Sequence, residues 1–164
     1  MNIMQKIELE KTSVYSKYID RVDYFDAFKM DLKDEKLSAE LIYKGMFSTV
    51  PAWVENLMKI RNKVVSLFGL KSVKGDSDLE FKVGNRAGMF HIYFISKNEV
   101  IAGEDDRHLN FRVSVLKEAK KVTVSTLVKY HNWFGKFYMT LIKPFHNLIV
   151  QIMMKNYLKK CRGI

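Results

Sequence analysis

The pattern of apolar and polar residues changes period several times along this chain. Near-alternation over residues 23–32 predicts a first strand. Apolar residues then recur at helical spacing in two segments, a short helix over about 38–47 and a second helix over about 51–69. Over 79–131 the period returns to two, which predicts a run of antiparallel strands, and the segment that follows is again helical.

The elements before residue 79 each have an apolar face. In the first strand, Tyr24, Phe28 and Met30 lie on one face. Pro51 suits the first turn of the second helix, where its missing N–H costs nothing, and Gly69 suits the C-terminal end. The inward face of this helix is predicted to carry Trp53, Leu57, Ile60, Val64 and Phe68.

The apolar patterns of the last two predicted strands indicate how these strands pair. HLNFRVSVL and KVTVSTLVKY are joined around Glu118-Ala119, and Lys97-Asn98 is a predicted turn into an earlier strand. Placing Val115 opposite Val122 aligns an apolar row on each strand and leaves the other face mostly polar. The same register pairs Val113 with Val124, Phe111 with Thr126, and Leu109 with Val128.

The C-terminal segment is predicted to cover that apolar face. Pro144 cannot continue a helix without losing a hydrogen bond, so we expect a short helix over 135–142 and a longer one that begins at Pro144. The longer helix is expected to turn Phe145, Leu148, Ile149, Ile152 and Met153 inward. The order of elements predicts an α+β fold in which 1–164 form a single domain.

Composition narrows the class of protein. With 48% hydrophobic residues, the 164-residue chain has enough apolar side chains for a core. The single cysteine, Cys161, excludes a disulfide framework, and neither a signal peptide nor a transmembrane run is apparent, so we expect a soluble cytoplasmic protein. The net charge of +10 comes from scattered basic residues apart from the tail, about 155–164, and predicts no specific nucleic-acid binding.

Three stretches carry a resemblance to a known family: GEDDRHLNFRVSV, VSTLVKYHNWFGKFYMTLIKPFHNLIV and, more weakly, VPAWVENLMKIRNKVVSLFGL. They are similar to a bacterial family catalogued as domain of unknown function 2867. The order of elements also resembles the helix-grip topology of the START-like (SRPBCC) superfamily. The resemblance implies a curved antiparallel sheet wrapped around a long C-terminal helix, two short helices after the first strand, and an apolar cavity. It assigns no catalytic residue.

Acid–base candidates gather in and near the DDRH segment. If Asp106 lies opposite His131, as the register above places it, its carboxylate could hold His131 charged. His108 is a third candidate, and Arg112 could hold an anionic group, although His108 and Arg112 fall on the polar face, where we expect solvent or another subunit. The alternative is that the DDRH segment has only a structural role, as a well-packed corner in which the carboxylates cap backbone amides. The spacing of the four histidines predicts no metal site, and no cofactor motif is present.

The residues at the end of the strand run, Tyr130 to Trp133, could form the mouth of a cavity or an ordinary helix-entry corner. We expect a domain that binds a hydrophobic or amphipathic small molecule, including a lipid. A cyclase or isomerase and a ligand-free interaction module are the alternatives, and a homodimer stays open. The expected ligand-binding residues are Phe90, Phe111, Val113, Val124, Tyr130, Trp133, Phe145 and Ile149.

Overall fold

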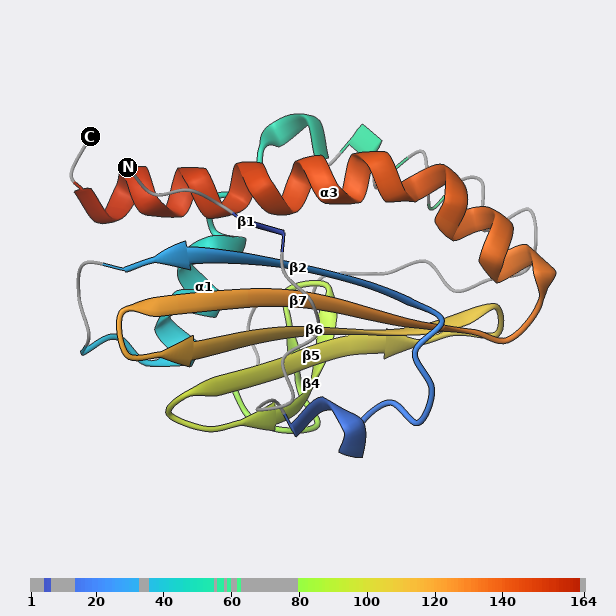
Figure 1. Ribbon diagram of the computed structural model, residues 1–164, viewed down its shortest axis with the longest axis horizontal. Helices are drawn as coiled ribbons and strands as arrows, with labels where there is room; N and C mark the ends of the chain where they lie inside the picture. Colours follow the sequence, from blue (N-terminus) through green and yellow to red (C-terminus); the bar gives the residue numbers. More distant parts are fainter. Residues whose placement is uncertain are drawn as a thin grey trace.

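The fold is an antiparallel sheet with helices on one face, seen in a computed structural model (Figure 1). The residues that the structure describes are 5–6, 14–32, 36–54, 56–57, 59, 62 and 80–162. Within them, seven strands lie in the order β1-β2-β7-β6-β5-β4-β3. The strands are β1 (Gln5–Lys6), β2 (Tyr24–Asp31), β3 (Arg86–Ala87), β4 (Phe90–Ile95), β5 (Glu99–Asp105), β6 (Leu109–Glu118) and β7 (Lys121–Tyr130). The predicted α+β class is confirmed.

The helical elements with described bounds are η1 (Val14–Lys17, a 3₁₀ turn), α1 (Ala39–Phe47) and α3 (Trp133–Arg162). Residues 52–54, 56–57, 59 and 62 are also helical. The Oγ of Ser38 caps α1 by accepting a hydrogen bond from the N–H of Leu41 at 3.3 Å. α3 packs on β2 and β7, whereas α1 packs on β5 and β6, and the two helices contact each other. The predicted first strand and the short helix that begins after Ser38 are therefore confirmed.

The predicted register of the β6–β7 hairpin is wrong by two residues. Val115 pairs with Val124, not with Val122, and Leu109 pairs with Tyr130. The turn consists of Ala119 and Lys120. Ala119 adopts a positive φ of 47°, which a sequence predicts at glycine or asparagine but not at alanine. Because side chains alternate with a period of two, a two-residue shift keeps every side chain on its predicted face.

The expected break at Pro144 is also wrong, because α3 runs as one 30-residue helix with Pro144 inside it. A proline there forfeits one backbone hydrogen bond and commonly bends a helix. Figure 1 shows such a bend, with the N-terminal part of α3 inclined toward the end of β7.

The inward face of α3 is only partly the one expected: Met153 is buried as predicted, and Ile149 packs against the core. Phe145 and Leu148 are half exposed, while Val150, Met154 and Tyr157 are buried against the sheet and α1. α3 is apolar most of the way round, so helical periodicity alone does not select the buried side. The exposed side keeps a row of large apolar residues.

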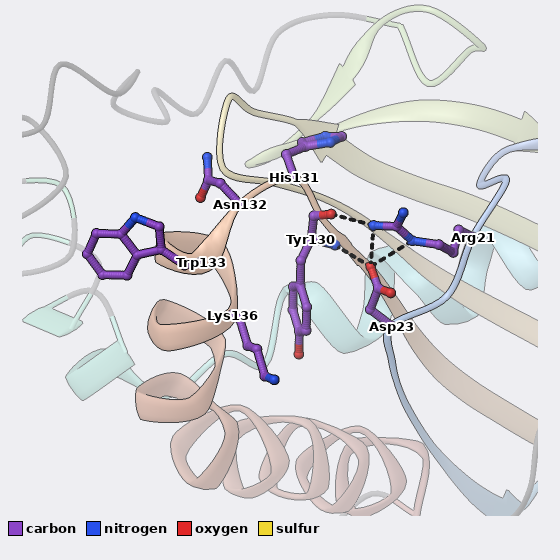
Figure 2. Close-up of a pocket in the computed structure, with 7 residues that line it drawn as sticks. All are labelled: Arg21, Asp23, Tyr130, His131, Asn132, Trp133 and Lys136. Atoms are coloured by element: carbon purple, nitrogen blue, oxygen red, sulfur yellow. Dashed lines mark hydrogen bonds and ion pairs between the residues drawn. The ribbon is translucent and has the colours of Figure 1, made fainter.

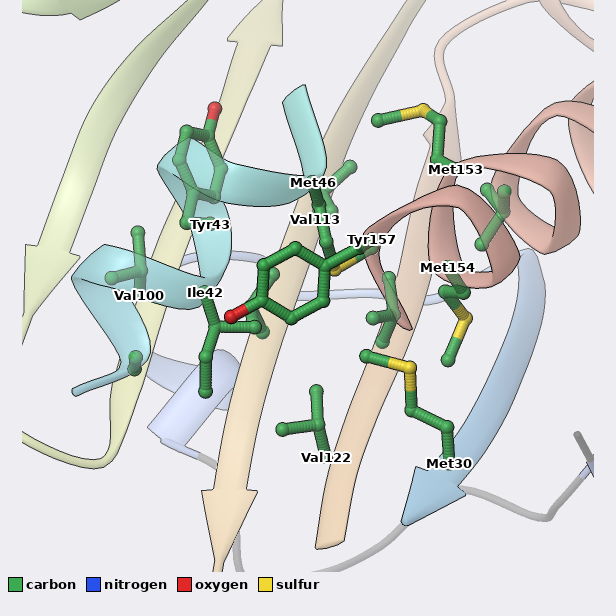
Figure 3. Close-up of a cluster of buried hydrophobic side chains, with 14 of the residues drawn as sticks. Met30, Ile42, Tyr43, Met46, Val100, Val113, Val122, Met153, Met154 and Tyr157 are labelled. Carbon is green, nitrogen blue, oxygen red and sulfur yellow. The ribbon is translucent and has the colours of Figure 1, made fainter. Parts of the chain in front are cut away.

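A core rich in methionine joins α1, α3 and the sheet (Figure 3). Met30 comes from β2, Met46 from α1, and Met153 and Met154 from α3. Gly45 lets the two helices approach, because a Cβ at this position would overlap the ring of Tyr157. Methionine adapts its shape easily, so this core can repack around a changed neighbour.

The second predicted helix is described only at its beginning. Val54 is buried there, whereas Trp53, which was expected to point inward, is 39% exposed. Leu57 is partly buried. The expected inward residues Ile60, Val64 and Phe68 and the expected stop at Gly69 lie outside the described residues.

Candidate functional site

A buried carboxylate interrupts the apolar face of the sheet beneath α3. Asp26 of β2 lies on the same face as Phe28 and Met30 and is fully buried. It pairs across the ladder with Thr126 of β7. A charged group in such a place costs free energy unless polar partners stabilise it, so its neighbours define a candidate site.

Side chains from three elements surround this carboxylate. The hydroxyl of Tyr24 donates to Asp26 Oδ2 at 2.6 Å. His146 of α3 places its Nε2 atom 3.6 Å from the same oxygen and 2.9 Å from the Oγ1 atom of Thr126. Asn147 follows on α3 and bonds the Tyr24 hydroxyl at 3.2 Å. β2, β7 and α3 thus build one polar cluster in an otherwise apolar layer.

The cluster keeps Asp26 ionised. Burial alone would raise the pKa of Asp26, but hydrogen bonds and charge from His146, together with hydrogen bonds from Tyr24 and Thr126, hold that pKa below its usual value. The pKa of Tyr24 is raised by burial and by the adjacent Asp26 carboxylate. At neutral pH the cluster therefore presents a carboxylate beside a neutral phenol.

Two buried oxygens on this side of the sheet have no hydrogen-bond partner among the described residues: Asp26 Oδ1 and the hydroxyl of Tyr43. Tyr43 lies on α1, within the methionine-rich core, and burial raises its pKa. A buried polar atom left without a partner costs about 1–3 kcal/mol. Asp26 Oδ1 could accept a further hydrogen bond, and the Tyr43 hydroxyl could donate or accept one, from a group outside the described residues.

The sequence signal for Asp26 was available but weak. In DYFDAFKMDL, Asp26 falls between Tyr24 and Phe28 on the row predicted to face the core. A charged residue inside an apolar row marks a buried polar site. His146 gave no such signal, because its contact with Asp26 depends on how α3 lies across the sheet.

The structure separates the predicted acid–base residues Asp106 and His131. The backbone N–H of His131 donates to the carbonyl of His108 at 3.0 Å, so the corrected register places His108 where Asp106 was expected. Asp106 instead places its Oδ2 atom 3.4 Å from His108 Nδ1. His131 is exposed, and its Nε2 atom donates to Asn110 Oδ1 at 2.8 Å.

His108 is buried rather than solvent-facing. Its ring lies edge-on to Phe134 and Tyr138 in the first turns of α3, at centroid distances of 5.6 and 5.0 Å. Its backbone carbonyl contacts Gly135, where a Cβ would overlap it. His108 therefore helps to seat the beginning of α3 on β6.

A shallow hollow of about 420 Å³ lies at the corner between β7 and α3 (Figure 2). Its lining comprises Arg21, Asp23, Tyr130, His131, Asn132, Trp133 and Lys136. The predicted mouth residues do line a depression, but two charged groups within it, Arg21 and Asp23, already bond each other. Arg21 Nη2 bonds Asp23 at 2.9 Å and the Tyr130 carbonyl at 2.7 Å, and Asp23 accepts from the Tyr130 N–H.

Arg112 lies on the predicted face of the sheet but not in solvent, since it is only 4% exposed. Its guanidinium bonds the Tyr18 carbonyl at 3.0 Å, forms an ion pair with Asp105 at 2.7 Å and stacks 3.8 Å from the ring centre of Tyr93. The segment around η1 thus covers this face, which the sequence did not predict. Arg112 is fully engaged in holding that cover.

The expected ligand-binding residues divide into three groups. Val113 and Val124 are buried in the core, and Phe90, Phe111 and Ile149 pack against it. Tyr130 packs in a smaller cluster around Leu109, Val128 and Met139. Trp133 and Phe145 lie exposed on α3. Phe145 was expected to point inward, whereas Trp133 was expected at a cavity mouth and lines the hollow of Figure 2.

Neither a metal site nor a membrane span emerges from the described residues. No three His, Cys, Asp or Glu side chains there lie close enough together to hold a metal ion. None of the helices in that part of the chain is long and apolar enough to cross a bilayer.

Comparison with known proteins identifies the family. Residues 18–153 match the family described as protein of unknown function, DUF2867. The match covers most of the chain and includes strands β2 to β7 and most of α3, so the chain belongs to this family. No curated protein and no solved structure matches it.

Proposed function

We propose that this protein binds a small amphipathic molecule between the sheet and the helices α1 and α3. The observation that carries the proposal is the presence of two buried oxygens without described partners, Asp26 Oδ1 and the Tyr43 hydroxyl. A ligand hydroxyl or amine that donates a hydrogen bond to Asp26 Oδ1 would remove the free-energy cost of burying that oxygen without a partner. The methionine-rich core supplies adaptable apolar contacts for the rest of the molecule.

The proposal has three further parts. The arrangement of sheet and C-terminal helix supports membership of the START-like superfamily. The exposed single cysteine, Cys161, suits a reducing cytoplasm. We expect micromolar affinity, roughly 8 kcal/mol, as for an apolar site with few polar contacts.

An isomerase or cyclase is the second candidate, and the Asp26–His146 pair favours it. Asp26 and Thr126 lie on the Nε2 side of His146, which leaves Nδ1 for a substrate proton. The side chain of His146 is 22% exposed, so a substrate can approach it. In this reaction the carboxylate would stabilise the imidazolium while His146 carries the proton between two substrate atoms.

Native mass spectrometry of the protein as purified from cells tests the binding proposal. We expect a bound small molecule, and we expect Asp26→Asn and Tyr43→Phe to weaken its retention at least about tenfold, as loss of a buried polar contact does. Tyr93→Phe and Asp105→Asn are matched controls, because Tyr93 donates to Asp105 on the opposite face of the sheet. Those controls should retain the ligand.

Tyr43→Phe also distinguishes the ligand-free protein from the ligand-bound protein. Without a ligand, removing a hydroxyl that has no partner should leave the free energy of unfolding unchanged or raise it. With the ligand bound, the same change should lower the melting temperature relative to the wild type. An empty wild-type protein in the mass spectrum, with identical behaviour of all four variants, would refute the binding proposal.

A further inference from the structure

The outward face of α3 carries five large apolar residues that no described element covers. They are Trp133, Phe137, Leu141, Phe145 and Leu148, here called the α3 stripe. Each is at least half exposed, from 50% for Leu148 to 79% for Trp133. Steps of four, four, four and three residues place all five on one side of the helix.

The α3 stripe is separate from the face that stabilises the fold. Met139, Val150 and Tyr157 lie on the opposite side of α3 and are buried. The stripe extends over about 22 Å at 1.5 Å per residue. A contiguous exposed row of aromatic and leucine side chains is unusual on a protein that has no partner and marks an interaction surface.

The charge of α3 indicates which partner fits. The helix contains no Asp or Glu, whereas it contains Lys136, Lys143, Lys155, Lys159 and Lys160. None of these lysines forms an ion pair with a described residue. Lys155 and Lys159 continue the line of the α3 stripe, seven and eleven residues after Leu148, so the exposed side is apolar first and cationic afterwards.

We propose that the α3 stripe docks on the surface of an anionic lipid bilayer, with α3 lying in the plane of the headgroups. Trp133 and Phe137 suit the interface between headgroups and acyl chains, and the lysines suit phosphate and carboxylate headgroups. A second copy of this chain is a poorer fit, because pairing two such faces brings two cationic surfaces together. The inference does not depend on the ligand proposed above.

The two tryptophans of the chain allow a direct test. In a Trp53→Phe protein, Trp133 is the sole tryptophan and reports on the α3 stripe. On mixing with phosphatidylcholine vesicles that contain phosphatidylserine, we expect its emission to shift to the blue and the protein to sediment with the vesicles. Phosphatidylcholine alone should bind it much more weakly, and added salt should release it.

Matched variants distinguish membrane binding by the α3 stripe from non-specific binding by other exposed apolar residues. Phe137→Glu with Leu141→Glu should weaken partitioning at least about tenfold, since it places two charges in the buried apolar contact. Lys155→Gln with Lys159→Gln should weaken it about fivefold per lysine. Leu41→Glu with Val83→Glu changes two equally exposed apolar residues outside α3 and should have no more effect than the loss of two net positive charges.

Three outcomes would overturn the proposal. The first is no sedimentation with anionic vesicles by a protein that is folded by circular dichroism. The second is equal loss of partitioning in the α3 stripe variant and in the Leu41 and Val83 variant. The third is a wild-type dimer that the α3 stripe variant converts to a monomer without vesicle binding by either, which would assign this face to a second copy of the chain.

Discussion

Asp26 and His146 come from opposite ends of the chain, yet Asp26 Oδ2 lies 3.6 Å from His146 Nε2. β2 supplies the carboxylate and α3 supplies the imidazole, so the pair links an outer part of the sheet to the helix that covers it. Because Tyr24 and Thr126 hold the same two groups, one contact serves both the seating of α3 and the chemistry of the cluster.

Asp26→Asn should lower the free energy of unfolding near neutral pH by about 2 kcal/mol, because Tyr24 and His146 lose a charged acceptor. The pKa of Asp26 is lowered in the folded protein. Its stabilising effect is therefore complete above the unfolded value, about 3.9, and disappears as the pH falls through the folded pKa. Urea denaturation at a series of pH values should show the two proteins converging below about pH 4. A difference that is constant from neutral to acidic pH would contradict this assignment.

Met154→Ala should cost about 2–5 kcal/mol of stability, because Met154 is fully buried between α3 and the sheet. Leu148→Ala is the control on the same helix. Leu148 is 50% exposed, and its truncation should change stability by about 0.5 kcal/mol or less. Both values can be measured from urea midpoints. A larger loss for Leu148→Ala than for Met154→Ala would mean that the buried and exposed sides of α3 have been exchanged.

Gly135→Ala should destabilise the protein although alanine favours helix by about 1 kcal/mol over glycine. The new Cβ would overlap the carbonyl of His108, which the first turn of α3 approaches closely. Lys136→Ala, at the exposed neighbouring position, should leave the melting temperature unchanged or raise it slightly. If Gly135→Ala raises the melting temperature, α3 does not approach β6 as described.

Arg112→Ala should cost about 3–5 kcal/mol, because it removes a buried cation that bonds Tyr18 and Asp105 and stacks on Tyr93. Arg21→Ala removes a surface ion pair with Asp23 and should cost about 1 kcal/mol or less. Thermal or chemical denaturation distinguishes the two. A mild effect at Arg112 would show that the segment around η1 does not close this face of the sheet.

Local patterns were sufficient for the first strand, for the helix that Ser38 caps and for the alternation of β6 and β7. The register failed because valine, threonine and serine repeat along both strands, so a shift of two residues again aligns apolar with apolar. The position of the turn could not be predicted from residue type either, since the residue with a positive φ is Ala119 and not glycine or asparagine. Pairing between repetitive strands is a property of the whole sheet.

The site was less accessible to sequence reasoning than the fold. The contact between Asp26 and His146 requires a continuous α3, and Pro144 led to a predicted break just before His146. Burial of Arg112 requires the segment around η1 to cross the far face of the sheet, and no periodicity in residues 14–23 indicates where that segment lies. Both features arise from contacts between distant parts of the chain.

The pairing of β2 with β7 also has a consequence for biosynthesis. β2 is made before its ladder partner, which ends at Tyr130, and before α3, which covers both. On the ribosome, β2 must therefore wait for about a hundred further residues, exposing Phe28 and Met30 in the meantime. Closure of so long a loop slows folding and prolongs the interval in which an unpaired strand can aggregate. We expect the native sheet to form only after α3 has left the ribosomal tunnel, which makes this fold dependent on late, whole-chain assembly.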